Sequence, residues 1–261
     1  MQIFFTYDHY AYATVALLGT WLALWGVMRA MHAPRWQAVL HGWRGVVPPF
    51  INITGVLFGL TLAFVANDTW NAHDRATNAV FREADALRSL MVLSERVQDP
   101  MLRHTLQQAL HGYAHASVTE WPLLAHRQSS TSVSDQADAL LLHIGSPQLT
   151  EAAGLQVQAL MLQKASGMRD ERNLRIGLSQ IHINPLKWLA MAFLGLLTLL
   201  AIALVHVDHP RAAVAAMVLF ALSAAPTAAI VLVQGNPFQP PVAVSSAPLL
   251  AAATPATVAV P

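Results

Sequence analysis

The stretch VVPPFINITGVLFGLTLAFVAN, residues 46–67, contains no charged side chain, and the charged run DTWNAHDR, residues 68–75, follows it directly. It is one of four uncharged stretches that are long enough for an α-helix to cross a hydrocarbon core about 30 Å thick: residues 11–28, 46–67, 188–207 and 212 onward. The two pairs flank a polar insert, residues 68–187, that holds 23 of the 29 charged residues. The sequence therefore predicts an all-α integral membrane protein with four spans.

Prolines limit the fourth span. Pro237, Pro240 and Pro241 confine its helix to about residues 212–233, because proline breaks helices. A cleaved signal peptide is the alternative for the first span, but no Lys or Arg precedes it and its apolar run exceeds roughly 7–15 residues. We therefore expect a first helix pair at residues 1–67, a helical extramembrane domain at 68–187, a second helix pair at 188–235 and an uncharged Pro/Ala-rich tail at 236–261.

The basic residues give opposite indications of orientation. By the positive-inside rule, the arginines of the short loops favour an insert that faces outward: Arg29, Arg35, Arg44 and Arg211. The edges of the insert are also basic, which favours the reverse: Arg75, Arg82, Arg88, Arg169, Arg172, Arg175 and Lys187. Both orientations stay open.

Composition excludes several functions. The net charge of +1 and the nearly neutral insert do not fit a nucleic-acid surface. Because the chain has no Cys, disulfides, thiol nucleophiles and thiolate metal sites are excluded.

The insert is predicted to be helical throughout. Apolar or small residues recur at the spacing of one helical face: Val80, Ala84, Leu87, Met91 and Ser94. No Gly or Pro separates them from the second span, which favours one long helix. Asp99-Pro100 and Ser146-Pro147 each combine an N-cap acceptor with proline at the first helical position. They predict one helix to about Thr119 and a long helix toward Gln180.

Two stripes of side chains separate on the second span at about 100° per residue. Asn52, Gly55 and Gly59 share one face with Leu62 and Ala66, and Gly55-x-x-x-Gly59 lets helix backbones approach closely. The other stripe alternates hydroxyl and bulky apolar groups and ends in a carboxylate: Thr54, Phe58, Thr61, Val65 and Asp68. If several copies met around an axis, Phe58 and Val65 would form apolar rings of the kind that constrict ion pathways.

The same residues also fit a purely structural role. Thr54 and Thr61 then bond back to their own helix, and the glycines only pack. The polar cluster that follows has two interpretations as well, an ion-binding or gating site and the solvated start of an extramembrane helix: Asn67, Asp68, His73, Asp74 and Arg75. We favour the solvated helix.

Neither a metal site nor an active site is predicted. His111 and His115 share a helix face, but Glu120 is the nearest acidic residue and the Glu of an H-E-x-x-H motif is absent. The run from Arg169 to Arg175 has charge pairs at i, i+3 and i, i+4, which normally support an exposed helix. We expect no enzymatic activity, no cofactor and no metal.

Four local sequences, taken in order, resemble a bacterial family of bestrophin-like membrane proteins. They are Phe64-Val65-Ala66-Asn67-Asp68-Thr69-Trp70, Arg82-Glu83-Ala84-Asp85-Ala86-Leu87, Glu120-Trp121-Pro122-Leu123 and Asn236-Pro237-Phe238. The resemblance covers about residues 50–249. We take its motif residues to be Phe64, Asn67, Asp68, Trp70, Glu83, Glu120, Trp121, Pro122, Pro237 and Phe238.

The resemblance implies a distant relation to bestrophins, which are ion channels, commonly anion-conducting pentamers whose second transmembrane helix lines the pore. It places the narrow neck on the stripe of Thr54, Phe58, Thr61 and Val65. It also implies a homo-oligomer in the lipid bilayer of the bacterial inner membrane, with small inorganic ions as partners. Gln239 and the two prolines after it replace the acidic residues of calcium-regulated members, so no calcium clasp is expected.

The sequence thus predicts a bestrophin-like ion channel with no nucleic-acid partner. The alternative is a non-conducting membrane scaffold or signalling protein whose helical domain, residues 68–187, recruits partners. An enzyme that acts on lipid lacks a nucleophile or metal set. The tail shows no packing pattern, which fits either a mobile terminus or contacts along neighbouring subunits.

Overall fold

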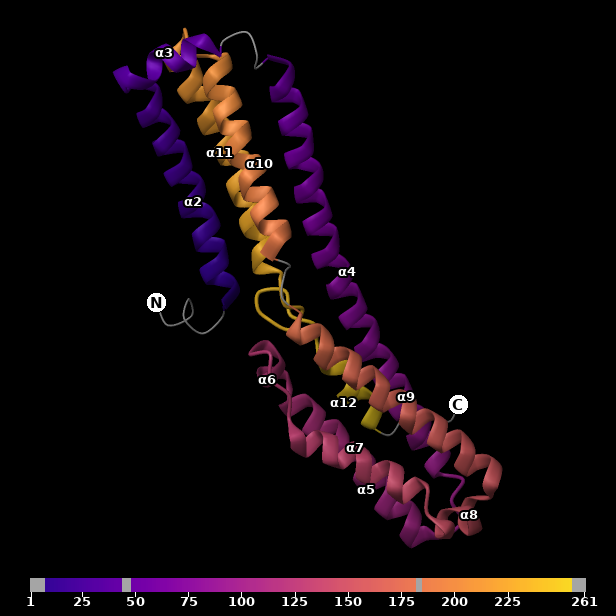
Figure 1. Ribbon diagram of the computed structural model, residues 1–261. Coiled ribbons are helices and arrows are strands. Elements are labelled where there is room, and N and C mark those ends of the chain that lie inside the picture. The colour runs from indigo at the N-terminus through magenta and orange to yellow at the C-terminus, as the bar shows by residue number, and fades with distance from the viewer. Residues whose placement is uncertain (1–7, 44–47, 182–184, 255–261) are drawn as a thin grey trace, which may run out of the picture. The chain divides into compact units, whose positions relative to one another are not determined.

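The computed structural model describes residues 8–43, 48–181 and 185–254, and every regular element in these ranges is a helix (Figure 1). The all-α prediction is confirmed. The described residues form two compact units. The first unit contains the chain up to Asn71 together with residues 185–235, and the second contains Ala72–Ile181 together with the chain from Asn236 onward.

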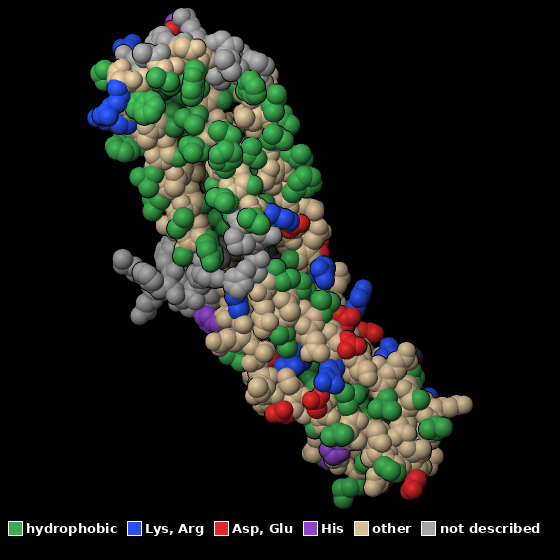
Figure 2. Space-filling view, viewed as in Figure 1, with side chains coloured by type: hydrophobic (Ala, Val, Ile, Leu, Met, Phe, Trp, Pro, Cys, Tyr) green, Lys and Arg blue, Asp and Glu red, His purple; other side chains and the backbone are tan. Residues whose placement is uncertain are grey.

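Within the described residues, four helices are long and apolar enough to cross a membrane, as predicted, with their apolar segments in Tyr10–Met31, Phe50–Ser94, Leu186–Val205 and Pro210–Val233. The helices of the first unit are α2 (Asp8–Met31), α3 (Pro34–Gly42), the start of α4 (Pro48–Ser94), α10 (Pro185–Val205) and α11 (Pro210–Val233). Figure 2 shows hydrophobic side chains over the outer surface of these long helices. An apolar surface of this kind suits contact with lipid tails.

Helices α2, α10 and α11 share one apolar core. Leu24 of α2 meets Leu199 of α10 and Met217 of α11, and all three are buried. The buried side of α11 is rich in alanine, including Ala213 and Ala221. Small side chains let membrane helices pack closely, so backbone proximity holds these three helices together.

Helix α4 is one uninterrupted helix of 47 residues that belongs to both units. In the second unit its Val80, Ala84, Leu87 and Ser94 are buried, at the spacing read from the sequence. The prediction that the second span and the first helix of the insert are one element is confirmed.

The second unit is a helical domain built around one main core. Its helices besides α4 are α5 (Pro100–Thr119), α6 (Trp121–Ala125), α7 (Thr131–Ile144), α8 (Pro147–Ala153), α9 (Leu155–Gln180) and α12 (Ala247–Ala253). Leu87 of α4, Leu110 of α5, Leu140 of α7, Met161 of α9 and Leu249 of α12 are all buried in this core. These five helices thus contribute apolar side chains to the same interior.

Both predicted helix starts are capped. An oxygen of Asp99 accepts hydrogen bonds from the backbone N–H groups of Met101 at 2.8 Å and Leu102 at 3.3 Å. The hydroxyl of Ser146 accepts one from the N–H of Leu149 at 3.4 Å. The first helix ends at Thr119, as predicted.

The prediction for the second of these helices was wrong in one respect. The helix that starts at Pro147 ends at Ala153, and a new helix runs from Leu155 to Gln180. Gly154 separates them with φ of 82°, a left-handed conformation that glycine adopts readily and other residues rarely do.

The C-terminal segment packs into the second unit. Phe238 and Val244 are buried in a small core with Val80 of α4 and Leu124 of α6. Between residues 236 and 244 the buried side chains follow no helical or strand period, so the sequence showed no packing pattern there. In α12 the buried Leu249, Ala252 and Ala253 do recur at helical spacing. Residues 236–253 are therefore held against their own chain, so of the two interpretations of the tail a mobile terminus does not fit them.

Candidate functional site

The predicted stripe on the second span faces other helices of the same subunit. Val65 is buried beside Val231 of α11. The ring of Phe58 lies 5.3 Å from the ring of Phe220, tilted by 58°. A Cβ atom added to Gly195 of α10 would stand 3.3 Å from Cε2 of Phe58. The stripe thus supplies contacts between α4 and its neighbours, and its role as a pore lining stays a prediction.

The two threonines of the stripe bond to their own helix. The hydroxyl of Thr54 donates to the carbonyl oxygens of Phe50 at 3.0 Å and Ile51 at 3.2 Å, and that of Thr61 donates to Leu57 at 2.7 Å. Each hydroxyl has only one proton, and it is used in these bonds. Both hydroxyls can therefore accept a hydrogen bond from another group but cannot donate one. A purely structural role for the stripe, in which Thr54 and Thr61 bond back to their own helix, predicts these hydrogen bonds.

Another side of α4 carries apolar side chains that no other helix in the described part of the subunit covers. Ile53, Val56, Leu60 and Phe64 are exposed, Val56 by 68% and Leu60 by 49% of its surface. At about 100° per residue they lie within about 80° of one another. We call these four residues the uncovered face. It includes Phe64, a family-motif residue, and the exposed Asn67 continues it toward the end of the span.

The predicted packing face borders the uncovered face. Asn52 and Gly59 are exposed and Gly55 is half-buried. Among the described residues, no heavy atom beyond the chain neighbours and the helix's own backbone lies within 4 Å of a Cβ added to Gly55 or Gly59. No other described helix of the subunit therefore uses the close approach that Gly55-x-x-x-Gly59 permits.

Polar contacts join the end of the α4 span to α10 and α11. Asp68 forms an ion pair with Lys187 of α10, and the indole N–H of Trp70 donates to the side-chain oxygen of Gln234 at 3.1 Å. Both side chains of the ion pair are about half exposed. Two family-motif residues thus tie three spans together where their apolar segments end.

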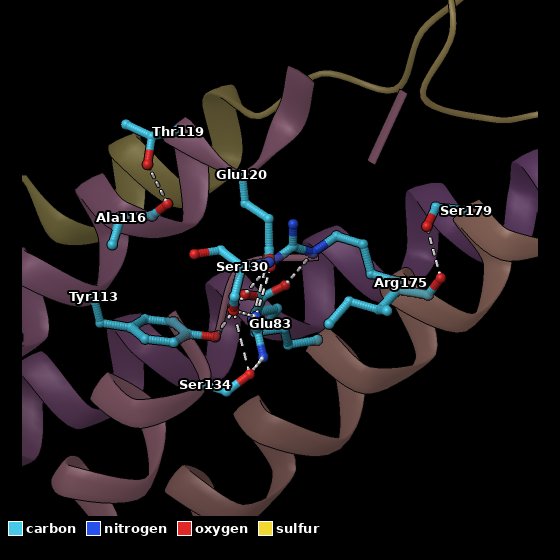
Figure 3. A network of polar contacts seen from close by, with 11 residues as sticks. Glu83, Tyr113, Ala116, Thr119, Glu120, Ser130, Ser134, Arg175 and Ser179 are labelled. Atoms are coloured by element: carbon cyan, nitrogen blue, oxygen red, sulfur yellow. Dashed lines mark hydrogen bonds and ion pairs between the residues drawn. The ribbon is translucent and has the colours of Figure 1, made fainter. Parts of the chain in front are cut away.

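A buried polar network lies in the second unit (Figure 3). Glu83 of α4 receives two hydrogen bonds from Arg175 of α9, Nε to Oε2 at 2.9 Å and Nη2 to Oε1 at 3.1 Å. The hydroxyl of Tyr113 on α5 donates to the same Oε1 at 2.8 Å. Both members of the ion pair are fully buried, so the network holds α4, α5 and α9 together.

Glu120 extends the network. It receives two hydrogen bonds from Arg172, Nη2 to Oε1 at 2.6 Å and Nε to Oε2 at 3.2 Å, and one from the backbone N–H of Ser130 at 2.8 Å. Nη2 of Arg175 lies 3.4 Å from Oε2 of Glu120. Arg172 also donates a hydrogen bond to the hydroxyl of Ser134. Two carboxylates thus face two guanidinium groups, which balances charge in an interior where unpaired charge is costly.

Trp121 connects the network to the C-terminal segment. The guanidinium carbon of Arg175 lies 4.6 Å from the centre of its ring, a cation-π distance. The ring is edge-on to Phe238 at 5.7 Å, and its N–H donates to the carbonyl oxygen of Val244 at 2.7 Å. The structure therefore brings together motif residues that are up to 155 positions apart, Glu83 and Phe238.

The remaining motif residues organise the backbone around Trp121. Pro122 stands in the first turn of α6. Beside Pro237, the side-chain amide of Asn236 donates to the carbonyl oxygen of Leu124 at 3.1 Å, and that of Gln239 donates to Ala125 at 2.7 Å. These amides bond to carbonyl groups at the end of α6, where helical partners run out. The carbonyl oxygen of Leu124 also accepts a hydrogen bond from the backbone N–H of Arg127 at 3.0 Å.

Tyr113 has a strongly perturbed pKa. Burial raises the pKa of its hydroxyl well above the ordinary value, and the negative charge of Glu83 raises it further, while Arg175 opposes the shift. Tyr113 is therefore a neutral donor to Glu83 at any physiological pH.

His111 and His115 lie one turn apart on α5, as expected. Within the described ranges, no three His, Asp or Glu side chains gather closely enough to hold a metal ion.

Comparison with known proteins gives the family. The model of the bestrophin-like domain matches residues 13–249 of the 261-residue chain. The chain belongs to the bestrophin-like family. Its structure is similar to the crystal structure of a point mutant of a bacterial bestrophin homolog from Klebsiella pneumoniae, with a TM-score of 0.63 and 15% sequence identity over 92% of this chain and 95% of that one. At this identity the likeness concerns the fold alone. No curated protein sequence matches the chain.

Sequence reasoning missed both arginines of the network in this bestrophin-like protein, and it did not single out Tyr113. The run from Arg169 to Arg175 was predicted to be an exposed helix, which was wrong for Arg172 and Arg175 because both are buried. The overlooked signal was periodicity. Buried positions of α9 recur every three or four residues and include both arginines: Met161, Ala165, Met168, Arg172, Arg175 and Ser179.

Proposed function

We propose that this bestrophin-like protein is an ion channel of the bacterial inner membrane in which several copies surround an axis lined by α4. The observation that supports this most directly is the uncovered face, Ile53, Val56, Leu60 and Phe64, on a helix whose other side packs within its own subunit. Family membership supports it independently, because bestrophins are ion channels. Small inorganic ions are the substrates, with anions the first class to test.

We propose that the uncovered face of α4, and not the stripe of Thr54, Phe58, Thr61 and Val65, lines the pathway. Phe58 is engaged by Phe220 and Val65 is buried, so turning them toward an axis requires the span to leave its own neighbours. Val56, Leu60 and Phe64 need no such change, and a ring of each would form an apolar constriction. In this proposal Thr54, Phe58, Thr61 and Val65 hold α4 in place from behind.

The glycines support an assembly of several copies. Gly55 and Gly59 border the uncovered face, and no other helix within the described ranges of the subunit approaches them. Glycines at this spacing favour close helix contacts, so we propose that a neighbouring copy packs there. A pentamer is the assembly that the bestrophin resemblance implies.

Ion flux through purified protein in liposomes tests the proposal, with chloride and potassium each measured separately. Leu60→Ala on the uncovered face is expected to raise or alter flux because it widens the constriction. Phe58→Ala is the matched substitution on the stripe, and it is expected to lower stability while changing selectivity little.

Three results are informative. Altered flux for Leu60→Ala alone supports the uncovered face as the lining of the pathway. Altered selectivity for Phe58→Ala alone instead supports the stripe that was predicted from the sequence as the lining. Absence of flux for every anion and cation tested, with intact oligomers present, overturns the channel proposal. That last outcome favours the scaffold whose helical domain recruits partners.

A further inference from the structure

Helix α3 exposes an apolar surface between two long apolar helices. Trp36 and Val39 of α3 and Trp43 just after it are exposed, the two tryptophans by 51% and 56% of their surfaces. They are spaced i, i+3 and i+7, which puts them on one side of a helix. This side has no partner among the described residues of the subunit.

The other side of α3 locates the helix within the first unit. Leu40 packs against the cluster of Ala201 and Leu204 near the end of α10, and Ile51 near the start of α4 packs against the same cluster. Met31 lies at the end of α2, three residues before α3 begins. It packs against the core that α2, α10 and α11 share. Helix α3 therefore lies at the end of the unit where α2 and α10 finish and where α4 and α11 begin.

Positive charge surrounds α3 at this end. Arg29 in the last turn of α2, Arg35 in α3 and Arg211 in the first turn of α11 are all exposed. Asp208 is the only acidic residue in positions 9–67 and 188–261 of the sequence. A tryptophan-rich apolar side beside a surplus of arginine matches the lipid interface, where indole rings lie at headgroup level and cations meet phosphate groups.

We propose that α3 is an interfacial helix that lies in the phospholipid surface and that the arginines around it bind the phosphate groups of anionic phospholipids. Trp36, Val39 and Trp43 enter the boundary between headgroups and acyl chains, while Arg29, Arg35 and Arg211 reach the headgroups. The proposal rests on the membrane location of α2 and α4 and does not require ion conduction.

Charge favours lipid over a second copy of the chain as the occupant. A symmetric contact between two copies would bring their arginines together with few carboxylates to balance them. An anionic phospholipid surface supplies the opposite charge and also accepts hydrogen bonds from the exposed indole N–H groups.

Single cysteines test the depth of α3, because the chain contains no cysteine of its own. Spin labels are placed on Val39→Cys, on Leu22→Cys as a lipid-facing reference in α2 and on Val92→Cys as a water-facing reference in the helical domain. All three parent side chains are exposed apolar residues. The full chain is reconstituted in phosphatidylglycerol and phosphatidylcholine, and accessibility to oxygen and to a water-soluble nickel complex is measured.

The label at position 39 is expected to favour oxygen over the nickel complex, as the Leu22 reference does. Accessibility equal to that of the Val92 reference overturns the proposal, since α3 would then lie in water. Exclusion of both reagents together with spin–spin broadening also overturns it, because a second copy would then cover α3.

The headgroup part has its own test. Binding of fluorescent phosphatidylglycerol and phosphatidylcholine is compared for the unaltered chain and for the double variant Arg35→Gln with Arg211→Gln. Affinity for phosphatidylglycerol is expected to fall about fivefold for each arginine removed, with little change for phosphatidylcholine. Arg82→Gln in the helical domain is the control. If the double variant binds phosphatidylglycerol as tightly as the unaltered chain does, the proposal that these arginines bind anionic headgroups is overturned.

Discussion

Glu83 and Arg175 form a two-point ion pair in which neither side chain is exposed. The pair joins α4, the helix that also carries the second span, to α9, 92 residues further along the chain. Glu120 lies 3.4 Å from the same guanidinium group, so the positive charge is shared between two carboxylates. The stability of the helical domain should therefore depend strongly on this contact.

Replacing Glu83 by Gln is expected to lower the free energy of unfolding by about 3–5 kcal/mol, because it leaves a buried guanidinium group without its main counter-charge. Denaturant titration in detergent micelles, followed by circular dichroism, measures the change. Arg82→Gln is the matched control, since the Arg82–Glu171 pair is largely exposed on the arginine side. That control should change stability by no more than about 1 kcal/mol. Equal midpoints for the two variants would contradict the role of the buried pair.

Replacing Tyr113 by Phe is expected to cost about 1–3 kcal/mol near neutral pH, because Glu83 loses a buried hydrogen-bond donor. The difference should shrink in alkaline solution. The pKa of the Tyr113 hydroxyl is raised in the folded state, so above pH about 10 the unfolded chain loses the hydroxyl proton before the folded chain does. The free energy of unfolding of the unaltered protein therefore falls as the pH rises. The Phe variant has no such proton, so its stability does not change for this reason. Thermal unfolding of both proteins between pH 8 and 11 measures the effect. A gap that stays constant over this range would count against a raised pKa.

Replacing Phe238 by Ala is expected to destabilise the helical domain by about 3–5 kcal/mol, because it empties a buried site against Trp121. Val242→Ala is the control, since that side chain is exposed on the same segment. Limited proteolysis should cut the C-terminal segment of the Phe238 variant faster than that of the control. Equal cleavage rates would show that Phe238 does not anchor the segment.

Replacing Gly195 by Leu is expected to destabilise the first unit by about 1–3 kcal/mol, because the new side chain overlaps the ring of Phe58. Gly19→Leu is a matched control in α2, where no heavy atom lies within 4 Å of an added Cβ. The loss of helical signal on heating in micelles compares the two. If both variants melt together, the contact between Phe58 and α10 contributes little.

Local chemistry determined the elements of this fold. The uncharged stretches are apolar over the length of a membrane, so the four spans follow from composition alone. Asp99 and Ser146 mark helix starts because their side chains accept hydrogen bonds from nearby N–H groups. The uninterrupted α4 follows from the absence of Gly and Pro after residue 59, since only local propensity is involved.

Tertiary structure alone decided which faces of these helices are used. A helical wheel separates the Thr54–Phe58 stripe from the uncovered face but does not say which one meets α10 and α11, because that depends on the side chains opposite. The same holds for Arg172 and Arg175, whose burial requires Glu83 and Glu120 from other helices. Sequence alone determined the four spans and the starts of the capped helices, because these depend on local composition and capping. Long-range contacts decided what each helix faces, since burial and charge pairing depend on residues far away in the chain.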